Sequence, residues 1–188
     1  MKRVAVLISG RGTNLQALID AKQDVYKIVL VISNVPDVEG LGRARRAGIE
    51  TIVIDHKRFG KDREAFEREI DMELAARAVD IVALAGFMRV LTPFFVRAWA
   101  GRLVNIHPSL LPKYPGTKTH ERALEAGDVE HGATVHLVVA QVDAGEIIGQ
   151  ARMPIFPTDT SESLAGRVLE LEHRLYPACL ARLAASLH

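Results

Sequence analysis

The amino-acid sequence predicts an α/β fold: a single-domain, Rossmann-like, doubly wound and mainly parallel sheet with an antiparallel hairpin in its C-terminal part. Three observations lead to this prediction. Short continuous runs of apolar residues recur over the first two thirds of the chain, as expected of strands covered on both faces. Segments with apolar residues at helical spacing separate these runs. In the last third, apolar and other residues alternate on both sides of a turn, which is typical of a hairpin.

The unbroken apolar runs predict five strands, at residues 4–8, 28–33, 51–54, 81–85 and 103–105. After the first strand, Leu15, Leu18 and Ile19 recur at helical spacing. After the second, a short helix is predicted over 42–47, and Gly48 ends it. Strands that alternate with helices in this way favour right-handed βαβ units and therefore a parallel sheet.

A long amphipathic helix is predicted over 62–79, between the third and fourth strands. Its apolar stripe consists of Phe66, Ile70, Leu74 and Ala78. In the last third, residues 132–139 and 146–153 form the two arms of the hairpin around the turn Asp143-Ala144-Gly145. They predict an antiparallel edge on the parallel sheet.

The final helix is predicted to begin at residues 159–162, which resemble a capping box. Its apolar positions are Leu164, Val168, Leu171 and Leu175. Pro177 is expected to kink or end this helix, because proline lacks the backbone N–H that an interior position needs. The sequence shows no repeat, low-complexity segment or long linker, so we expect one domain over 1–188.

Composition excludes several classes of protein. The chain has 188 residues and a formal net charge of +1, which gives no support for a nucleic-acid or membrane surface. No apolar stretch approaches the roughly 20 residues that span a bilayer, and Ser9-Gly10-Arg11-Gly12 interrupts the first apolar run too early for a signal peptide. Cys179 is the only cysteine, which excludes an intrachain disulfide and a cysteine metal cluster. We therefore expect a cytoplasmic enzyme or binding domain.

A glycine-rich turn over 10–14 connects the first strand to its helix. Free backbone amides and the helix dipole favour an anion at such a turn. The dinucleotide fingerprint is not met, because its third glycine is missing and no acidic residue ends the second strand, so NAD is not expected. The turn predicts one phosphate held by the amides of Gly12, Thr13 and Asn14; an ordinary tight turn is the alternative.

Asn105 and His107 stand at the end of the fifth strand. Side chains alternate across a strand, so both should point to the same side. Pro108 cannot continue a ladder and should leave them at the carboxyl end, where open α/β sheets bind ligands. A carboxamide and an imidazole can together bind an oxyanion and deliver a proton. The alternative is a polar strand end before a proline-rich loop.

Further candidates have a structural alternative each. Glu172 shares an apolar helix face, where a carboxylate costs several kcal/mol unless it is paired or meets a polar ligand; it could also lie at the helix rim. Residues 86–91 could line a slot for a flat ring or belong to the core. Arg63 opens the long helix, where an external anion or plain solvation would explain a cation. His136 has apolar neighbours, and we interpret it as a satisfied core histidine. Asp143 could simply form its turn.

Six motifs follow one another along the whole chain, and in this order they resemble one family. They are Ile8-Ser9-Gly10-Arg11-Gly12-Thr13-Asn14-Leu15-Gln16, Ala85-Gly86-Phe87-Met88-Arg89, Asn105-Ile106-His107-Pro108-Ser109-Leu110-Leu111-Pro112-Lys113-Tyr114-Pro115-Gly116, Gly132-Ala133-Thr134-Val135-His136, Asp143-Ala144-Gly145 and Glu172-His173. Together they resemble the phosphoribosylglycinamide formyltransferases, folate-dependent enzymes of purine biosynthesis. Several separated motifs in order are far more specific than any one of them.

The resemblance implies the formyltransferase fold and direct transfer of a formyl group from 10-formyltetrahydrofolate, the co-substrate, to the amine of phosphoribosylglycinamide. It implies a catalytic set of Asn105, His107 and Asp143. Substrate binding would fall to Gly12, Thr13, Asn14, Leu169, Glu170, Leu171 and Glu172. Folate binding would fall to Arg63, Met88, Arg89, Val90, Leu91, Asn105, Val139, Ala140, Gln141, Val142 and Asp143. It implies no metal, and a monomer or homodimer that acts on small molecules.

The chain departs from the family's pattern at two places. Arg11 replaces a residue that is usually small or polar, and could add charge at the phosphate. Thr117-Lys118 stands where the family often has an apolar residue and a histidine, so no role is assigned to Lys118 or to the neighbouring His120. Neither departure falls on the catalytic set.

Four other functions are compatible with parts of the sequence. Methionyl-tRNA formyltransferase and formyltetrahydrofolate hydrolase share the chemistry, but usually carry an additional domain, and +1 is a poor charge for binding tRNA. A non-catalytic folate- or nucleotide-binding module is disfavoured by the presence of Asn105, His107 and Asp143 together. A nicotinamide oxidoreductase is disfavoured by the broken dinucleotide fingerprint.

Overall fold

The computed structural model describes residues 1–187, and it confirms the predicted α/β architecture. One seven-stranded sheet has the order β3-β2-β1-β4-β5-β6-β7. Its strands are β1 (Lys2–Ile8), β2 (Tyr26–Ser33), β3 (Glu50–Val53), β4 (Ile81–Leu84), β5 (Leu103–His107), β6 (Glu130–Leu137) and β7 (Ile147–Pro154). Adjacent strands from β3 to β5 pair in parallel, whereas β5–β6 and β6–β7 pair antiparallel. The predicted antiparallel edge is therefore confirmed.

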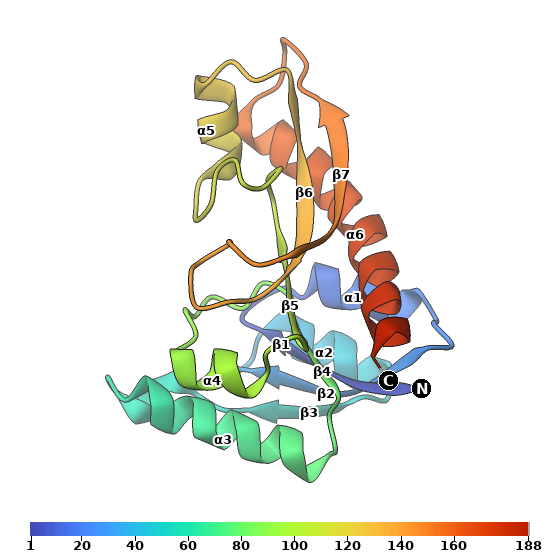
Figure 1. Cartoon of the computed structure of the whole chain (residues 1–188), viewed down its shortest axis with the longest axis vertical. Helices are drawn as coiled ribbons and strands as arrows, with labels where there is room; N and C mark the ends of the chain where they lie inside the picture. Colours follow the sequence, from blue (N-terminus) through green and yellow to red (C-terminus); the bar gives the residue numbers. More distant parts are fainter. Residues whose placement is uncertain (188) are drawn as a thin grey trace.

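Helices cover both faces of the sheet (Figure 1). They are α1 (Thr13–Asp20), α2 (Glu39–Arg46), α3 (Arg63–Ala76), α4 (Pro93–Ala98), α5 (Thr119–Glu125) and α6 (Ser161–Ser186), with a 3-10 turn η1 (His56–Phe59). Alternate residues of β1 enter different cores: Val4, Val6 and Ile8 pack with α1, α2 and α6, whereas Ala5 and Leu7 pack with α3 and α4. This explains why β1 reads as a continuous apolar run. None of the helices in the described range is long and apolar enough to cross a membrane.

Two helix ends differ from the predictions. The long helix α3 ends at Ala76, and Ala78 is exposed with φ +47° rather than lying on the apolar stripe. The amide of Val79 donates to the carbonyl of Leu74, a closure in which glycine usually takes the left-handed position. Alanine at that position gave no stop signal. The predicted helix over 42–47 begins three residues earlier, and α4 and η1 were not predicted.

Pro177 was expected to kink or end the last helix; an end there is wrong, because α6 continues through Pro177 to Ser186. Residues on both sides of Pro177 are anchored in the core. Tyr176 is fully buried, and its hydroxyl donates to the carbonyl of Leu84 at 2.8 Å and lies 3.2 Å from that of Val104. Cys179 and Leu180 are buried on the same face. This burial offsets the hydrogen bond that proline removes.

The sheet order fixes where a ligand can bind. From β1, the chain adds β2 and β3 on one side and then β4 and β5 on the other, so the connection reverses between β1 and β4. Crevices at such a reversal, beyond the carboxyl ends of the strands, are the usual ligand sites of open α/β sheets. The glycine-rich turn after β1, the segment after β4 and the end of β5 all lie at this edge.

Candidate active site

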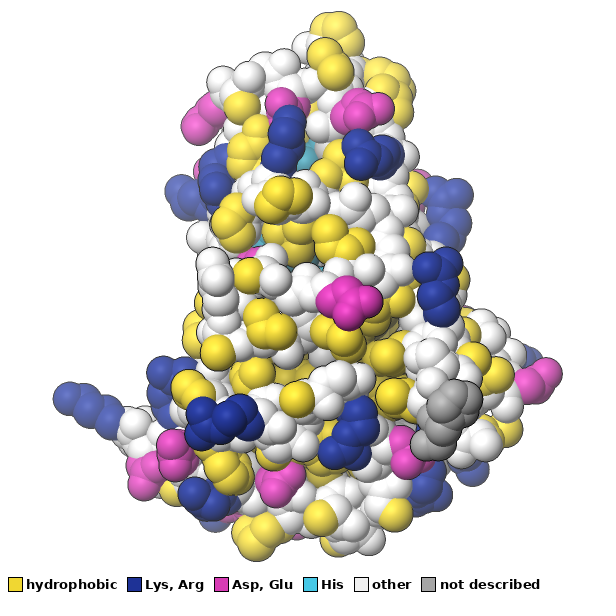
Figure 2. All heavy atoms as spheres, in the orientation of Figure 1, with side chains coloured by type: hydrophobic (Ala, Val, Ile, Leu, Met, Phe, Trp, Pro, Cys, Tyr) yellow, Lys and Arg dark blue, Asp and Glu magenta, His cyan; other side chains and the backbone are white. Residues whose placement is uncertain are grey.

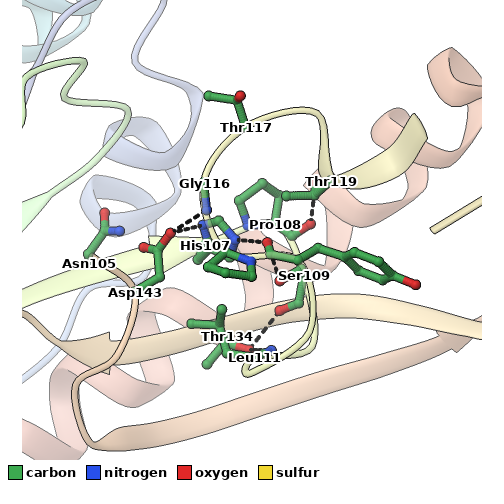
Figure 3. A network of polar contacts seen from close by, with 12 residues as sticks. Asn105, His107, Pro108, Ser109, Leu111, Gly116, Thr117, Thr119, Thr134 and Asp143 are labelled. Atoms are coloured by element: carbon green, nitrogen blue, oxygen red, sulfur yellow. Dashed lines mark hydrogen bonds and ion pairs between the residues drawn. The ribbon is translucent and has the colours of Figure 1, made fainter. Parts of the chain in front are cut away.

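Asn105 and His107 lie two residues apart on β5 and point to one side of the sheet, as predicted (Figure 3). β5 ends at His107, immediately before Pro108. Asn105 is partly exposed, whereas His107 is only 5% exposed. The strand therefore presents the amide toward the pocket and holds the imidazole behind it.

The hydrogen bond of His107 fixes its tautomer. Its Nε2 lies 2.8 Å from the backbone carbonyl oxygen of Tyr114. Because a carbonyl oxygen only accepts, Nε2 carries the hydrogen. Nδ1 is then the nitrogen that can gain or lose a proton, and it lies 3.5 Å from Oδ2 of Asp143.

Asp143 reaches this site from the loop between β6 and β7. Its backbone is left-handed, with φ +53°, and its side chain is only 9% exposed. Oδ2 accepts a hydrogen bond of 2.8 Å from the amide of Gly116 in addition to facing His107. Figure 3 shows the carboxylate between Asn105 and His107. The structure thus brings together the three residues proposed as the catalytic set.

His136, predicted to be a satisfied core histidine, is buried and hydrogen-bonded, and it also belongs to this cluster. It is 2% exposed and stands opposite Asn105 in the β5–β6 register. Its Nδ1 donates to the backbone carbonyl of Leu137 at 2.9 Å. Nε2 is then left to accept from the side-chain amide (Nδ2) of Asn105 at 3.4 Å. Nε2 is also 3.6 Å from Oδ1 of Asp143.

Burial lowers the pKa of His136, which favours the neutral ring that this pattern requires. His136 therefore orients the Asn105 amide and leaves its second N–H free. The only sequence signal was the alternation that places Thr134 and His136 on one face of β6. The alternation points to the site only when the pairing of β6 with β5 is known, because that pairing places His136 opposite Asn105.

The loop that follows His107 is tied to the sheet by polar contacts. The hydroxyl of Thr134 donates to the carbonyl of Ser109 at 2.7 Å and accepts from the amide of Leu111 at 3.1 Å. Ser109 in turn donates to the carbonyl of Lys113 at 2.6 Å. These contacts fix the loop whose Tyr114 carbonyl and Gly116 amide hold His107 and Asp143.

Thr117-Lys118, one of the two places at which the chain departs from the family's pattern, lies outside this cluster. Thr117 points away from His107 and Asp143 in Figure 3. Lys118 is exposed and forms an ion pair of 3.5 Å with Glu121. His120, at the start of α5, lies 3.1 Å from the Nε2 of buried His131.

A cavity of about 170 Å³ opens beside Asn105, His136 and Asp143. Its other walls are mostly apolar and come from the segment after β4 and the loop after β6. They are formed by Leu84, Phe87, Arg89, Val90, Leu91, Val96, Val138, Val139, Ala140 and Val142. Most residues predicted for the folate site are thus gathered here, but Gln141 is exposed and does not line the cavity. His107 does not line it either.

A second cavity, of about 320 Å³, lies over the glycine-rich turn. It is lined by Ser9, Gly10, Arg11, Gly12, Thr13, Asn14, Ala85, Gly86, Met88 and Leu169. Met88, predicted for the folate site, faces this cavity, so the segment over 86–91 separates the two. Thr13 and Asn14 are the first residues of α1, and no side chain caps this helix end. Their amides have no partner within the helix and are available to an anion.

The shape of this turn depends on close packing between two glycines. Gly12 has φ +71°, and a Cβ there would lie 2.7 Å from the Cα of Gly40 in α2. The amide of Gly40 donates to the carbonyl of Gly10 at 3.1 Å, and Arg43 donates from Nε to the carbonyl of Arg11 at 2.8 Å. The start of α2 therefore packs against the turn and hydrogen-bonds to its backbone, a contact that was not predicted from the sequence.

We predict that Gly12→Ala displaces this turn and destabilises the protein. Left-handed backbone at a non-glycine residue costs about 1–2 kcal/mol, and the contact with the Gly40 backbone adds to it. Gly48→Ala is the matched control, because Gly48 also has φ +71° but has no atom within 4 Å of a Cβ. Chemical unfolding should show a larger loss for Gly12→Ala. Equal losses in the two variants would contradict a role of the glycine packing.

Glu172 lies behind the second cavity rather than in its wall. It is 6% exposed, and its Oε2 accepts from the side-chain amide of Asn14 at 3.0 Å. Burial raises the pKa of Glu172 to about 7, and the Asn14 hydrogen bond opposes this rise. Oδ1 of Asn14 is buried without a partner among the described residues. The pair therefore leaves one unsatisfied polar atom next to the cavity, Oδ1 of Asn14, that a ligand hydroxyl can satisfy.

The remaining predicted residues are more peripheral. Leu169 lines the second cavity, whereas Glu170 is exposed and Leu171 partly buried, and neither lines it. Arg63 donates from its guanidinium to the carbonyl of Val90 at 2.5 Å, on the outside of the segment that walls the first cavity.

The surface carries no single strong field on the face shown in Figure 2. Acidic and basic side chains alternate there, with hydrophobic areas between them, and histidine atoms show only in small recesses. Among residues 1–187, no three His, Cys, Asp or Glu side chains are grouped so as to hold a metal ion.

The arrangement can support acyl-group transfer. Asn105 offers an amide N–H to a developing oxyanion, and the Asp143–His107 pair offers a carboxylate with a titratable nitrogen behind it. These groups border an apolar cavity on one side, and a cradle of free amides lies beyond the 86–91 segment. A reaction between a flat apolar donor and a small anionic acceptor fits both cavities.

Comparisons with known proteins agree with this chemistry. The family model described as formyl transferase matches residues 2–180. The chain is 50% identical, over 181 residues, to phosphoribosylglycinamide formyltransferase of Escherichia coli, covering 95% of this chain and 85% of that protein. A crystal structure of glycinamide ribonucleotide transformylase 1 from Symbiobacterium toebii superposes with a TM-score of 0.93 at 44% identity, covering 98% and 88% of the two chains.

Longer relatives contain a similar region. The trifunctional purine biosynthetic protein adenosine-3 of Drosophila melanogaster is 56% identical over 187 residues, or 97% of this chain. The chain spans 14% of the length of that relative.

Proposed function

Because the chain belongs to the formyl transferase family, we propose that it transfers the formyl group of 10-formyltetrahydrofolate to the amine of phosphoribosylglycinamide, in purine biosynthesis. The observation that carries this proposal is the meeting of Asn105, His107 and Asp143 between a mostly apolar cavity and an amide-lined turn. An apolar slot suits the folate, and free amides at a helix start suit a phosphate.

The first cavity binds the pterin ring of the folate. Its volume of about 170 Å³ suits a small ring system rather than a whole folate, so the rest of the molecule runs over the rim. Val139 and Val142 are 42% and 53% exposed at that rim and can pack against the benzoyl group. The N10-formyl group then lies next to Asn105 and Asp143.

The second cavity binds the acceptor. The amides of Gly12, Thr13 and Asn14 hold the phosphate, and the exposed Arg11 adds a cation beside it. Asn14 and Glu172 accept hydrogen bonds from the ribose hydroxyls, which satisfies the unpaired Oδ1 of Asn14. The glycinamide amine points past the 86–91 segment toward the formyl carbon.

The transfer itself exchanges one carbon–nitrogen bond for another. The acceptor amine attacks the formyl carbon, and Asn105 donates to the resulting oxyanion. The new ammonium loses a proton to Asp143, directly or through a water, and His107 shares that proton through Nδ1. As the bond from N10 to carbon breaks, N10 receives a proton, so the proton count closes without a cofactor.

A turnover assay tests the proposal. We expect release of tetrahydrofolate only when both phosphoribosylglycinamide and 10-formyltetrahydrofolate are present, with formylated product in equal amount. Release without the acceptor would indicate a hydrolase, and formylation of methionyl-tRNA would indicate the tRNA-directed enzyme. Binding of both ligands without turnover would indicate a binding module.

We further propose the setting in which this activity operates. The chain would act in the cytoplasm as a monomer or homodimer on small molecules, without nucleic acid, membrane, metal or NAD. The net charge of +1 and the mixed charges on the face shown in Figure 2 support the proposal that nucleic acid is not a ligand.

Glu172→Gln provides a prediction with a defined pH dependence. The pKa of the Glu172 carboxyl rises from 4.5 to about 7 on folding. A raised pKa favours the protonated form, so its stabilising effect is full below 4.5 and is lost as pH rises through about 7. Wild-type stability should therefore fall by up to about 3 kcal/mol between pH 4 and pH 8, whereas the variant lacks this part of the decline.

Chemical unfolding of both proteins across this pH range measures the effect. Glu170→Gln, an exposed change on the same helix, is the control and should retain the wild-type profile. We also expect Glu172→Gln to raise KM for phosphoribosylglycinamide about tenfold, because a neutral acceptor replaces a carboxylate at the ribose. Identical pH profiles for wild type and Glu172→Gln would contradict the buried carboxyl.

A further inference from the structure

The segment between β4 and α4 is held by side chains of other elements at every second residue from Met88 to Thr92. The amide of Met88 donates to Oγ of Ser9 at 2.8 Å. The carbonyl of Val90 accepts from Arg63. The amide of Thr92 donates to Oε1 of Glu67 at 2.7 Å, and the Thr92 hydroxyl donates to Oε2 of the same carboxylate.

The opposite edge of this segment is open. Phe87, Arg89, Val90 and Leu91 line the first cavity, although the carbonyl of Val90 is bound by Arg63. Within residues 1–187, no hydrogen bond engages the backbone N–H groups of Arg89, Val90 and Leu91. A pterin offers ring nitrogens and a carbonyl that such donors can bind. Holding residues 88, 90 and 92 from behind leaves this edge free for a ligand.

Glu67 is the most unusual of these anchors. It is 1% exposed in α3, where it lies between the buried apolar residues Phe66 and Ile70 in the sequence. Burying a carboxylate is costly unless hydrogen bonds compensate, and an apolar residue would pack there at no such cost. Both carboxylate oxygens of Glu67 accept hydrogen bonds from the same residue, Thr92.

Thr92 shows the same departure from the usual pattern. It is the N-cap residue of α4, where a threonine hydroxyl normally accepts from a helix amide. Here no side-chain cap forms, and the hydroxyl is directed to Glu67 instead. The start of α4 therefore lacks a side-chain cap, and the hydroxyl instead fixes the end of the 88–92 segment to α3.

We propose that Glu67 is a positioning residue for the folate pocket: through Thr92 it fixes the 88–92 backbone so that its free N–H groups face the pterin. The inference rests on the proposed function for the identity of the ligand. Glu67 does not line the cavity and acts only through Thr92. Its loss should weaken folate binding while leaving the acceptor site and the transfer step intact.

The experiment compares Glu67→Gln, Thr92→Val and Thr92→Ser with wild type. Glu67→Gln keeps the shape but removes the charge, Thr92→Val removes only the hydroxyl, and Thr92→Ser restores it. Glu64→Gln is the control, because Glu64 lies on the same helix, is 54% exposed and pairs with Arg68. We measure both KM values and kcat, the Kd of tetrahydrofolate by calorimetry, and the Tm.

We expect Glu67→Gln and Thr92→Val to raise KM for 10-formyltetrahydrofolate and Kd for tetrahydrofolate about tenfold. KM for the acceptor and kcat should stay within about twofold of wild type, and Thr92→Ser and Glu64→Gln should behave as wild type. Folded Glu67→Gln and Thr92→Val proteins with unchanged Kd would overturn the inference. So would a fall in Tm with equal changes in kcat and both KM values.

The outcomes also separate this inference from the proposed function. A wild-type protein that binds tetrahydrofolate but does not formylate the acceptor would refute the function. The Kd comparison would still decide the role of Glu67. A wild-type protein that binds no tetrahydrofolate would overturn both.

Discussion

Asp143→Ala is expected to lower kcat by roughly 10²–10⁴-fold, the usual range for a general acid–base group. Asp143 is the one charged group of the catalytic set that both lines the cavity and contacts His107. In the proposed mechanism it takes the proton of the attacking amine and passes it toward N10. Without it, the ammonium formed by attack has no acceptor within the site other than water.

Binding should survive this change, because the phosphate turn and the pterin walls come from other segments. Steady-state kinetics with each substrate varied in turn measure kcat and both KM values. Glu146→Ala is the matched control, since Glu146 is an exposed carboxylate of the same β6–β7 connection. Near-wild-type turnover of Asp143→Ala would refute the assignment.

Asp143→Asn separates the charge from the loop contact. An asparagine oxygen can still accept from the amide of Gly116, as Oδ2 does at 2.8 Å. The variant should therefore keep the 113–118 loop in place and still lose most of kcat. If Asp143→Asn were active and Asp143→Ala inactive, Asp143 would serve the loop rather than the proton transfer.

The sequence predicted the parts of the fold and site that depend on local pattern. The end of a strand could be predicted where a residue that cannot continue the ladder follows it, as Pro108 follows His107. The convergence of Asp143 on this strand came from the resemblance to a family, because residues 36 positions apart meet only through the β5–β6–β7 pairing. Local periodicity contains no information on that pairing.

The features that the sequence analysis missed also depend on contacts between residues far apart in the sequence. His136 looked like a core histidine because its chain neighbours are apolar, and its role depends on Asn105 in the adjacent strand. The sequence analysis did not single out Glu67, whose carboxylate in α3 accepts from Thr92 at the start of α4. Pro177 predicted a kink or an end of the last helix, whereas the burial of Tyr176 and Leu180 keeps α6 continuous. At Pro177, packing outweighs a local rule.

His107→Ala is expected to lower kcat to a similar extent as Asp143→Ala, roughly 10²–10⁴-fold, for a different reason. Nε2 of His107 is committed to the Tyr114 carbonyl, so the proton that matters resides on Nδ1, 3.5 Å from Asp143. Removing the ring deletes both the titratable nitrogen and the tether of the loop. Substrate KM values should change far less than kcat, because His107 does not line either cavity.

His107→Gln distinguishes the two losses. A glutamine side-chain amide can still donate to the Tyr114 carbonyl, but it cannot exchange a proton near neutral pH. We expect His107→Gln to keep the wild-type Tm and to lose kcat as severely as His107→Ala. Full activity in His107→Gln would show that the tether alone is needed. The ring would then act by holding the Gly116 amide against Asp143, and the carboxylate would be the only proton carrier at the formyl carbon.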